Sequence, residues 1–115
     1  MEAILQELTK IRGTQAAAII GRDGLLIQSE GDPGVDADFL AASFADMCST
    51  LENHLSDKLK QGNPQYFEVE TPLSRWFIIG LNDMNFLVIK SELQINLGLL
   101  RQEIKNARMK LLDIL

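Results

Sequence analysis

The chain of 115 residues has one cysteine and one histidine, Cys48 and His54, too few for most kinds of site chemistry. One cysteine cannot form an internal disulfide, so the composition favours a reducing compartment, and we expect a cytoplasmic protein. A zinc site normally needs four cysteine or histidine ligands. A nucleophile needs a base held beside it, and no residue stands in a recognisable motif with His54. We therefore expect no catalytic residue, no metal site, no cofactor and no enzymatic activity.

The chain also lacks an excess of basic residues and any long apolar run. It has 11 lysine and arginine residues against 16 aspartate and glutamate residues, for a net charge of −5. This balance argues against a nucleic-acid surface and against adhesion to anionic membranes. The longest apolar runs, such as Ala16–Ile20, are too short to cross a bilayer, so no membrane insertion is expected. The stretch Met1–Glu7 has no basic region or apolar core typical of a signal peptide.

A β-hairpin is predicted where two short apolar runs, Ala16–Ile20 and Leu25–Ser29, flank Arg22-Asp23-Gly24. Gly24 adopts positive φ without steric cost, so it can close the turn, with a bulge. The alternative, a metal or phosphate site at Asp23-Gly24, is unnecessary because the flanking strands already require a turn. The segment also lacks the lysine and serine or threonine of a phosphate loop, and it leads into a strand.

Three helices are predicted, over Glu2–Arg12, Ala37–Lys60 and approximately Glu92–Asp113. Asp36 can cap the second helix, and its first turn carries a further acidic residue that suits the helix dipole. The third helix is preceded by Ser91-Glu92-Leu93-Gln94, which matches a capping box.

The second helix has an apolar stripe that we expect to lie on the sheet. The stripe consists of Leu40, Phe44, Met47, Cys48, Leu51, Leu55 and Leu59. On this stripe Cys48 is interpreted as a small buried hydrophobic residue rather than as a nucleophile. Beside it runs a seam of small side chains, Ala42, Ala45, Ser49 and Ser56. Small residues allow another backbone to come close, so the seam favours a helix–helix dimer; plain surface alanines and serines are the alternative.

Three more strands are predicted after the second helix. Gln65–Thr71 alternates polar and apolar residues, whereas Arg75–Leu81 and Phe86–Lys90 are apolar on both faces. Together with the hairpin they predict an α+β fold, an α/β/α sandwich in the order α-β-β-α-β-β-β-α. Its five-stranded antiparallel sheet is covered by helices on both faces and forms one domain over residues 1–115. Trp76 is expected to pack in the core, with a partner anchor as the alternative.

The outer strands of this sheet are expected to be Leu25–Ser29 and Tyr66–Glu70, because these are the more polar ones. An uncovered edge strand is prone to pair with another chain. Two interpretations of the second edge stay open: Glu68 and Glu70 guard it, or it pairs with another copy.

The element order, the hairpin over Ala17–Gly24 and the helix start at Asp36–Leu40 resemble the Roadblock family. This family includes the Roadblock-type dynein light chains and bacterial partners of small Ras-like GTPases. The resemblance covers nearly the whole chain, and it implies a dimer in which the middle helices pack side by side and edge strands join two sheets. The dimer interface implied for this chain consists of Ala42, Ala45, Ser49, Glu52, Ser56, Tyr66, Phe67, Glu68 and Val69. On this basis Ala45→Glu is expected to break the dimer but leave the fold intact.

The resemblance implies a non-enzymatic homodimeric regulator or adaptor that binds a Ras-like small GTPase. Such a protein can stimulate GTP hydrolysis, but the pattern does not single out a catalytic arginine among Arg12, Arg22, Arg75, Arg101 and Arg108. Two alternatives remain: a structural scaffold subunit of a motor or signalling complex, and a small-molecule sensor domain. A large apolar cavity would favour the sensor.

Overall fold

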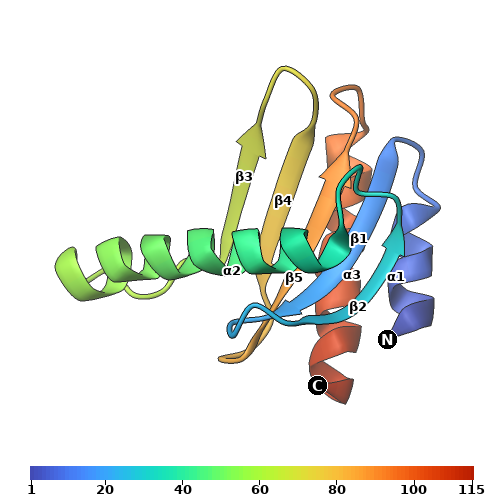
Figure 1. The fold of residues 1–115 in the computed structure, drawn as a ribbon. Helices are drawn as coiled ribbons and strands as arrows, with labels where there is room; N and C mark the ends of the chain where they lie inside the picture. Colours follow the sequence, from blue (N-terminus) through green and yellow to red (C-terminus); the bar gives the residue numbers. More distant parts are fainter.

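Five antiparallel strands form one sheet in the order β2-β1-β5-β4-β3, with α2 on one face and α1 and α3 on the other (Figure 1). The computed structural model describes all 115 residues. Its elements are α1 (Glu2–Thr9), β1 (Thr14–Gly21), β2 (Leu26–Gly31), α2 (Ala37–Glu52), the π-helical η1 (Asn53–Lys58), β3 (Tyr66–Glu70), β4 (Arg75–Gly80), β5 (Asn85–Ser91) and α3 (Leu97–Ile114). The predicted fold class, element order and edge strands are confirmed. Each of the helices is too short or too polar to span a bilayer.

The three inner strands divide their side chains between two cores, as their doubly apolar sequences predict. Ile19 of β1 packs under α1 and α3, whereas the next residue, Ile20, packs under α2. Phe77 and Ile78 of β4 alternate in the same way. Each such side chain stabilises the fold by about 1.5–3 kcal/mol on burial, so the two cores together hold the helices to the sheet.

The hairpin turn has the predicted glycine conformation and the predicted bulge. Gly24 has φ +88°, and the pairing between β1 and β2 shifts by one residue between Ile19 and Ile20. The Asp23 carboxylate accepts a hydrogen bond from the Leu25 backbone N–H at 3.1 Å. The Asp23 side chain is therefore part of the turn.

The second helix is shorter than predicted and does not lie on the sheet along its whole length. Regular α-helix ends at Glu52 and continues as η1. Leu40, Phe44 and Cys48 are buried, but Met47 is 40% exposed and Leu59 is 60% exposed. The last turns of this helical stretch extend beyond β3, at the left of Figure 1, where no sheet lies beneath them.

The capping box predicted at Ser91–Gln94 is wrong, and α3 begins five residues after Glu92. Ser91 pairs with both Thr14 and Arg75, so the backbone there is extended strand and cannot start a helix. Its buried hydroxyl donates to the Glu92 carbonyl instead. The N-cap is Asn96, whose side chain accepts a hydrogen bond from the Leu99 N–H at 3.0 Å.

Asn96→Ala is expected to lower the free energy of unfolding by about 1 kcal/mol, because it removes this cap. Gln94→Ala is the matched control, since Gln94 occupies the glutamine position of the rejected capping box and is exposed. Its unfolding free energy is expected to stay within about 0.5 kcal/mol of the parent value. Urea titration followed by circular dichroism measures both; a larger effect at Gln94 would contradict the assignment.

Candidate functional site

An apolar row runs along the part of α2 and η1 that extends beyond the sheet. It consists of Met47, Leu51, Leu55 and Leu59, spaced four residues apart, with Leu51 and Leu55 half-buried. In an α-helix four residues exceed one turn by about 40°, so such a row spirals around the axis. In a π-helix, with roughly 4.4 residues per turn, four residues fall short of a turn by about 30°. The change to π-helix at η1 therefore brings Leu59 back into line with the row.

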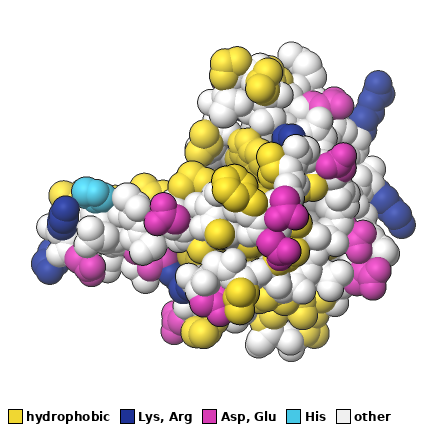
Figure 2. Space-filling model, viewed as in Figure 1, with side chains coloured by type: hydrophobic (Ala, Val, Ile, Leu, Met, Phe, Trp, Pro, Cys, Tyr) yellow, Lys and Arg dark blue, Asp and Glu magenta, His cyan; other side chains and the backbone are white.

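The sheet beside this row presents further apolar side chains. Phe67 and Val69 of β3 and Trp76 of β4 share the α2 face of the sheet, and Val69 is 41% exposed. Trp76 packs against Phe44 with 5.1 Å between ring centroids, which confirms the expected core packing, while part of the ring remains accessible. Figure 2 shows apolar side chains gathered along the upper edge of α2 and on the sheet above it. We name this surface the apolar step; it consists of the apolar row together with Phe67, Val69 and Trp76.

The edge strand β3 contributes Phe67 and Val69 to the apolar step, and its polar side chains lie on the opposite face of the sheet. Glu68 accepts hydrogen bonds from the Tyr66 hydroxyl and from Arg101 of α3, whose Nη2 lies 2.7 Å from Glu68 Oε1. Arg75 pairs with Glu70 at 2.7 Å. The carboxylates are thus held by neighbours in the same chain, away from the apolar step.

The Tyr66–Glu68–Arg101 cluster is fixed in one protonation state at neutral pH. Burial, followed by the hydrogen bond to Glu68, raises the pKa of Tyr66 to about 12, so its hydroxyl remains a donor. Burial favours a higher pKa for Glu68, but hydrogen bonds from Tyr66 and Arg101 outweigh it and lower that pKa, so the carboxylate stays charged. The cluster holds the side chains of β3 in place without titrating between pH 6 and 9.

The predicted seam of small residues faces the hairpin instead of the apolar step. Ala45 is 7% exposed and lies against the hairpin turn at Gly24. Glu52 forms an ion pair with Arg22, whose guanidinium also lies 4.4 Å from the ring centroid of Phe86. These two interface candidates are thus engaged within the chain.

The other predicted interface residues divide between the two sides of α2 and β3. Ala42 and Ser49 are exposed on the hairpin side, and Ser56 is half-buried. The structure brings Phe67 and Val69 together with the row at the apolar step. Tyr66 and Glu68 belong to the polar cluster. The exposed row was not singled out from the sequence, because its leucines were assigned to the sheet-facing stripe.

Cys48 lies in the core under α2, as its place on the apolar stripe predicts, and His54 lies at the surface. His54 is exposed on η1, and Cys48 is 1% exposed. Burial raises the pKa of the Cys48 thiol to about 11, and the nearby Arg22 offsets this only in part. No group of three or more histidine, cysteine, aspartate or glutamate side chains lies close enough together to hold a metal ion.

The Cys48 thiol is expected to react with a disulfide reagent at least about 100-fold more slowly in the folded protein than in urea, because the thiol is buried and its pKa lies above that of a free cysteine. Absorbance of the released thiolate at pH 8 follows the reaction. Equal rates in buffer and in urea would show that α2 opens readily from the sheet.

An apolar pocket lies between the start of α2 and the sheet, but it is very small. Its walls include Leu40, Trp76 and Val88, and it encloses about 10 Å³, the space of one water molecule. Lys90 closes one side, with its Nζ donating to the Pro33 carbonyl at 2.9 Å. This pocket gives no support to the small-molecule sensor.

The sequence matches the family model of the Roadblock/LC7 domain over residues 1–91. It is 25% identical over 111 residues to the uncharacterized protein MJ1340 of Methanocaldococcus jannaschii, and the match covers 96% of each chain. The fold is similar to that of Myxococcus xanthus MglB, with a TM-score of 0.91 at 23% identity over 98% of this chain and 85% of that one. A structure described as MglB with tetrameric arrangement has a TM-score of 0.84 at 19% identity, covering 97% and 85%.

Proposed function

Because this chain belongs to the Roadblock/LC7 domain family, we propose that it is a non-enzymatic homodimer that regulates or recruits a small Ras-like GTPase in the cytoplasm. The observation that carries the proposal is the apolar step beside the unpaired edge of β3. A monomer would leave Met47, Leu59 and Val69 in water, although a polar residue at each of these positions would cost the fold little. The surface therefore favours a function in binding other proteins.

A twofold-symmetric dimer accounts for the apolar step without any further partner. In an isologous interface the same surface serves both copies, so each surface must complement itself. The end of α2 that extends beyond β3 in one copy covers the exposed face of β3 and β4 in the other. Antiparallel pairing of the two β3 strands then satisfies the open edge. In this arrangement the α2 helices of the two copies lie side by side, as the family resemblance implies. They contact each other through the apolar row and not through the seam of small residues.

The GTPase is the partner that the family resemblance implies for the dimer. Holding the switch segments of one nucleotide state more tightly than those of the other shifts the GTPase population toward the preferred state. The ratio of the two affinities sets the size of the shift, so no catalytic group is required from this chain. A structural scaffold is the second candidate, because the same dimer surface would serve a protein that binds its partner equally well in either nucleotide state.

The proposal is tested with a Ras-like GTPase encoded beside this chain in its genome, purified and loaded with GDP or with a non-hydrolysable GTP analogue. Regulation predicts at least about tenfold tighter binding of one form in titration calorimetry. Equal affinities for the two forms would favour the scaffold, and no binding to either form would contradict the GTPase proposal. Sedimentation of the chain alone tests the dimer separately, since a strict monomer at high micromolar concentration would exclude it.

A further inference from the structure

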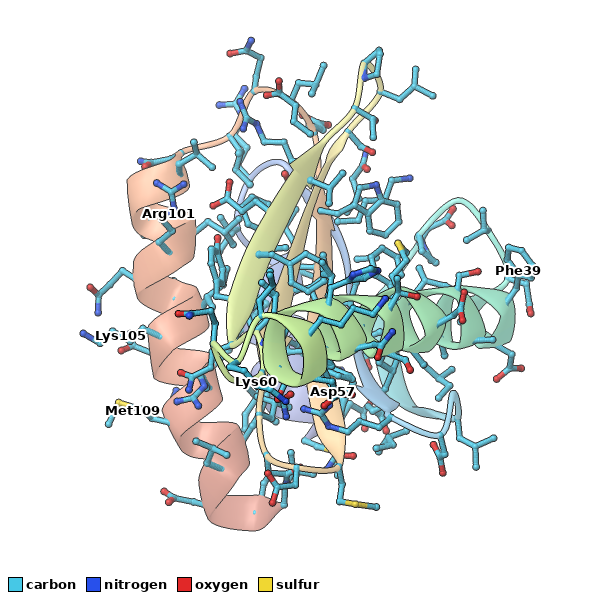
Figure 3. All side chains as sticks on the ribbon, turned by 90° about the vertical axis from the view of Figure 1, so that its left-hand side faces the viewer. Phe39, Asp57, Lys60, Arg101, Lys105 and Met109 are labelled. Carbon is cyan, nitrogen blue, oxygen red and sulfur yellow. The ribbon has the colours of Figure 1, made fainter.

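The apolar row on α2 continues beyond the apolar step to an exposed phenylalanine near the start of the helix. Phe39 is 67% exposed and lies two four-residue steps before Met47. Figure 3 shows Phe39 near one end of the helical stretch and Lys60 just past the other end. The midpoint between Phe39 and Leu59 in the sequence is Ser49. We name the whole set the extended row; its members are Phe39, Ser43, Met47, Leu51, Leu55 and Leu59.

The proposed dimer places its twofold axis level with this midpoint. Phe44 of α2 packs on Trp76 of β4, and α2 runs across the strands toward the β3 edge (Figure 1). When two β3 strands pair in antiparallel fashion, the axis passes half a strand spacing beyond β3, which is about 7 Å past β4. This distance corresponds to about five residues of α2 beyond Phe44. The axis therefore lies level with Ser49, and the extended rows of the two copies face each other in antiparallel register.

The two ends of the extended row differ in charge. Residues 30–38, around the start of α2, contain four acidic residues and no lysine or arginine. Lys90 reaches this end from β5, but its Nζ donates to the Pro33 carbonyl, and it forms no ion pair with these acidic residues. At the far end, residues 57–60 contain two lysines and one aspartate. Antiparallel pairing therefore brings the acidic end of one copy beside the basic end of the other, twice in each dimer.

Lys60 has a backbone conformation that is unfavourable for a lysine. Its φ is +59°, and the other residues with positive φ in this chain are all glycines. In this left-handed region the Cβ atom lies too close to a backbone carbonyl oxygen, so glycine would end the helix at a lower cost. Lys60 is exposed and makes no ion pair within the chain. A strained lysine without an internal partner favours a contact outside the single chain.

We propose that Lys60 of each copy pairs with the partner's Asp36, while Leu59 packs on the partner's Phe39. This inference rests on the proposed dimer and adds what the chain recognises in a second copy. Lys60 lies about 11 residues past the axis, level with the first turn of the partner's α2. One Asp36 oxygen caps α2 by accepting from the Phe39 N–H at 3.1 Å, which leaves the other oxygen free for the ion pair.

Charge reversal at Lys60 and its relief at Asp36 test the pairing, with the dimer dissociation constant measured by sedimentation velocity. Lys60→Glu is expected to weaken the dimer at least about tenfold, because like charges then meet at both ends of the interface. Adding Asp36→Asn to this variant is expected to recover at least about threefold, since asparagine removes the charge and still caps the helix.

Asp38→Asn, added to Lys60→Glu, is the matched control for this recovery. It removes the same charge two residues along, but from a position about 200° away around the helix. Its affinity is expected to stay within about twofold of that of Lys60→Glu alone. Equal recovery from Asp36→Asn and Asp38→Asn, or recovery from neither, would overturn the proposed pairing.

Lys60→Gly separates the side chain of Lys60 from the helix end that it forms. Glycine relieves the backbone, so the chain is expected to melt at the same or a higher temperature at dilutions where it is monomeric. The dimer is nevertheless expected to dissociate about fivefold more readily, because two exposed ion pairs are lost. An unchanged dimer would overturn the pairing and leave the proposed dimer standing. A strict monomer for the unsubstituted chain would contradict the proposed dimer, and the pairing with it.

Discussion

Replacing Met47 and Leu59 together by glutamate is expected to convert the proposed dimer to a monomer while the chain stays folded. Both side chains are substantially exposed in the single chain, so the charges remain hydrated when the protein is monomeric. In the dimer each charge would be buried against apolar groups without a partner, at a cost of about 2 kcal/mol or more. Two such charges in each copy weaken association by at least about 1,000-fold. Sedimentation velocity across the micromolar range measures the change.

Ser49→Glu is the matched control for this experiment. Ser49 is exposed on α2 between the two substituted positions, but it lies on the side that faces the hairpin. If the apolar step is the interface, this variant remains dimeric and retains its thermal stability. A monomeric Ser49→Glu variant, together with a dimeric Met47→Glu, Leu59→Glu variant, would restore the small-residue seam as the interface.

The fold was predictable because its strands and helices carry strong local signals. β1, β4 and β5 are apolar on both faces, which requires helices above and below them, and the glycine turn at Gly24 sets the hairpin. The start of α3 was mispredicted because a capping box is a local pattern. Pairing of Ser91 on both sides is a long-range property that a local pattern does not contain.

The proposed interface was harder to predict, because apolar periodicity does not reveal what the helix packs against. The apolar stripe from Leu40 to Leu59 can pack equally well against a sheet and against a second copy of the chain. One signal was available: a helix rises about 28 Å from Leu40 to Leu59, whereas five strands side by side span about 19 Å between the outer ones. A helix that crosses such a sheet must extend beyond it, so the last leucines of the stripe cannot all lie on the sheet. The position of the hairpin turn, which determines which side of α2 is free, depends on tertiary packing.

The sequence alone predicts that Ala45→Glu leaves the fold intact, but Ala45 is buried against the hairpin, so this substitution is expected to destabilise the single chain strongly, whatever its oligomeric state. Ala45 is 7% exposed and lies against the hairpin turn at Gly24, so a longer side chain at this position starts from a buried site. A glutamate there must either bury its charge or push the turn away from α2. The expected loss is about 3–5 kcal/mol. This is a large part of the 5–15 kcal/mol typical of a whole domain.

Ala42→Glu is the control for this substitution, since Ala42 lies one turn earlier on the same side of α2 and is exposed. Its melting temperature should stay within a few degrees of the parent, whereas that of Ala45→Glu should fall by more than about 10 °C. Melting at several protein concentrations separates unfolding from dissociation, because only a coupled dimer shows a concentration-dependent midpoint. A stably folded, monomeric Ala45→Glu protein would mean that Ala45 contacts the second copy. A loss of stability at every concentration would place its contact within the chain.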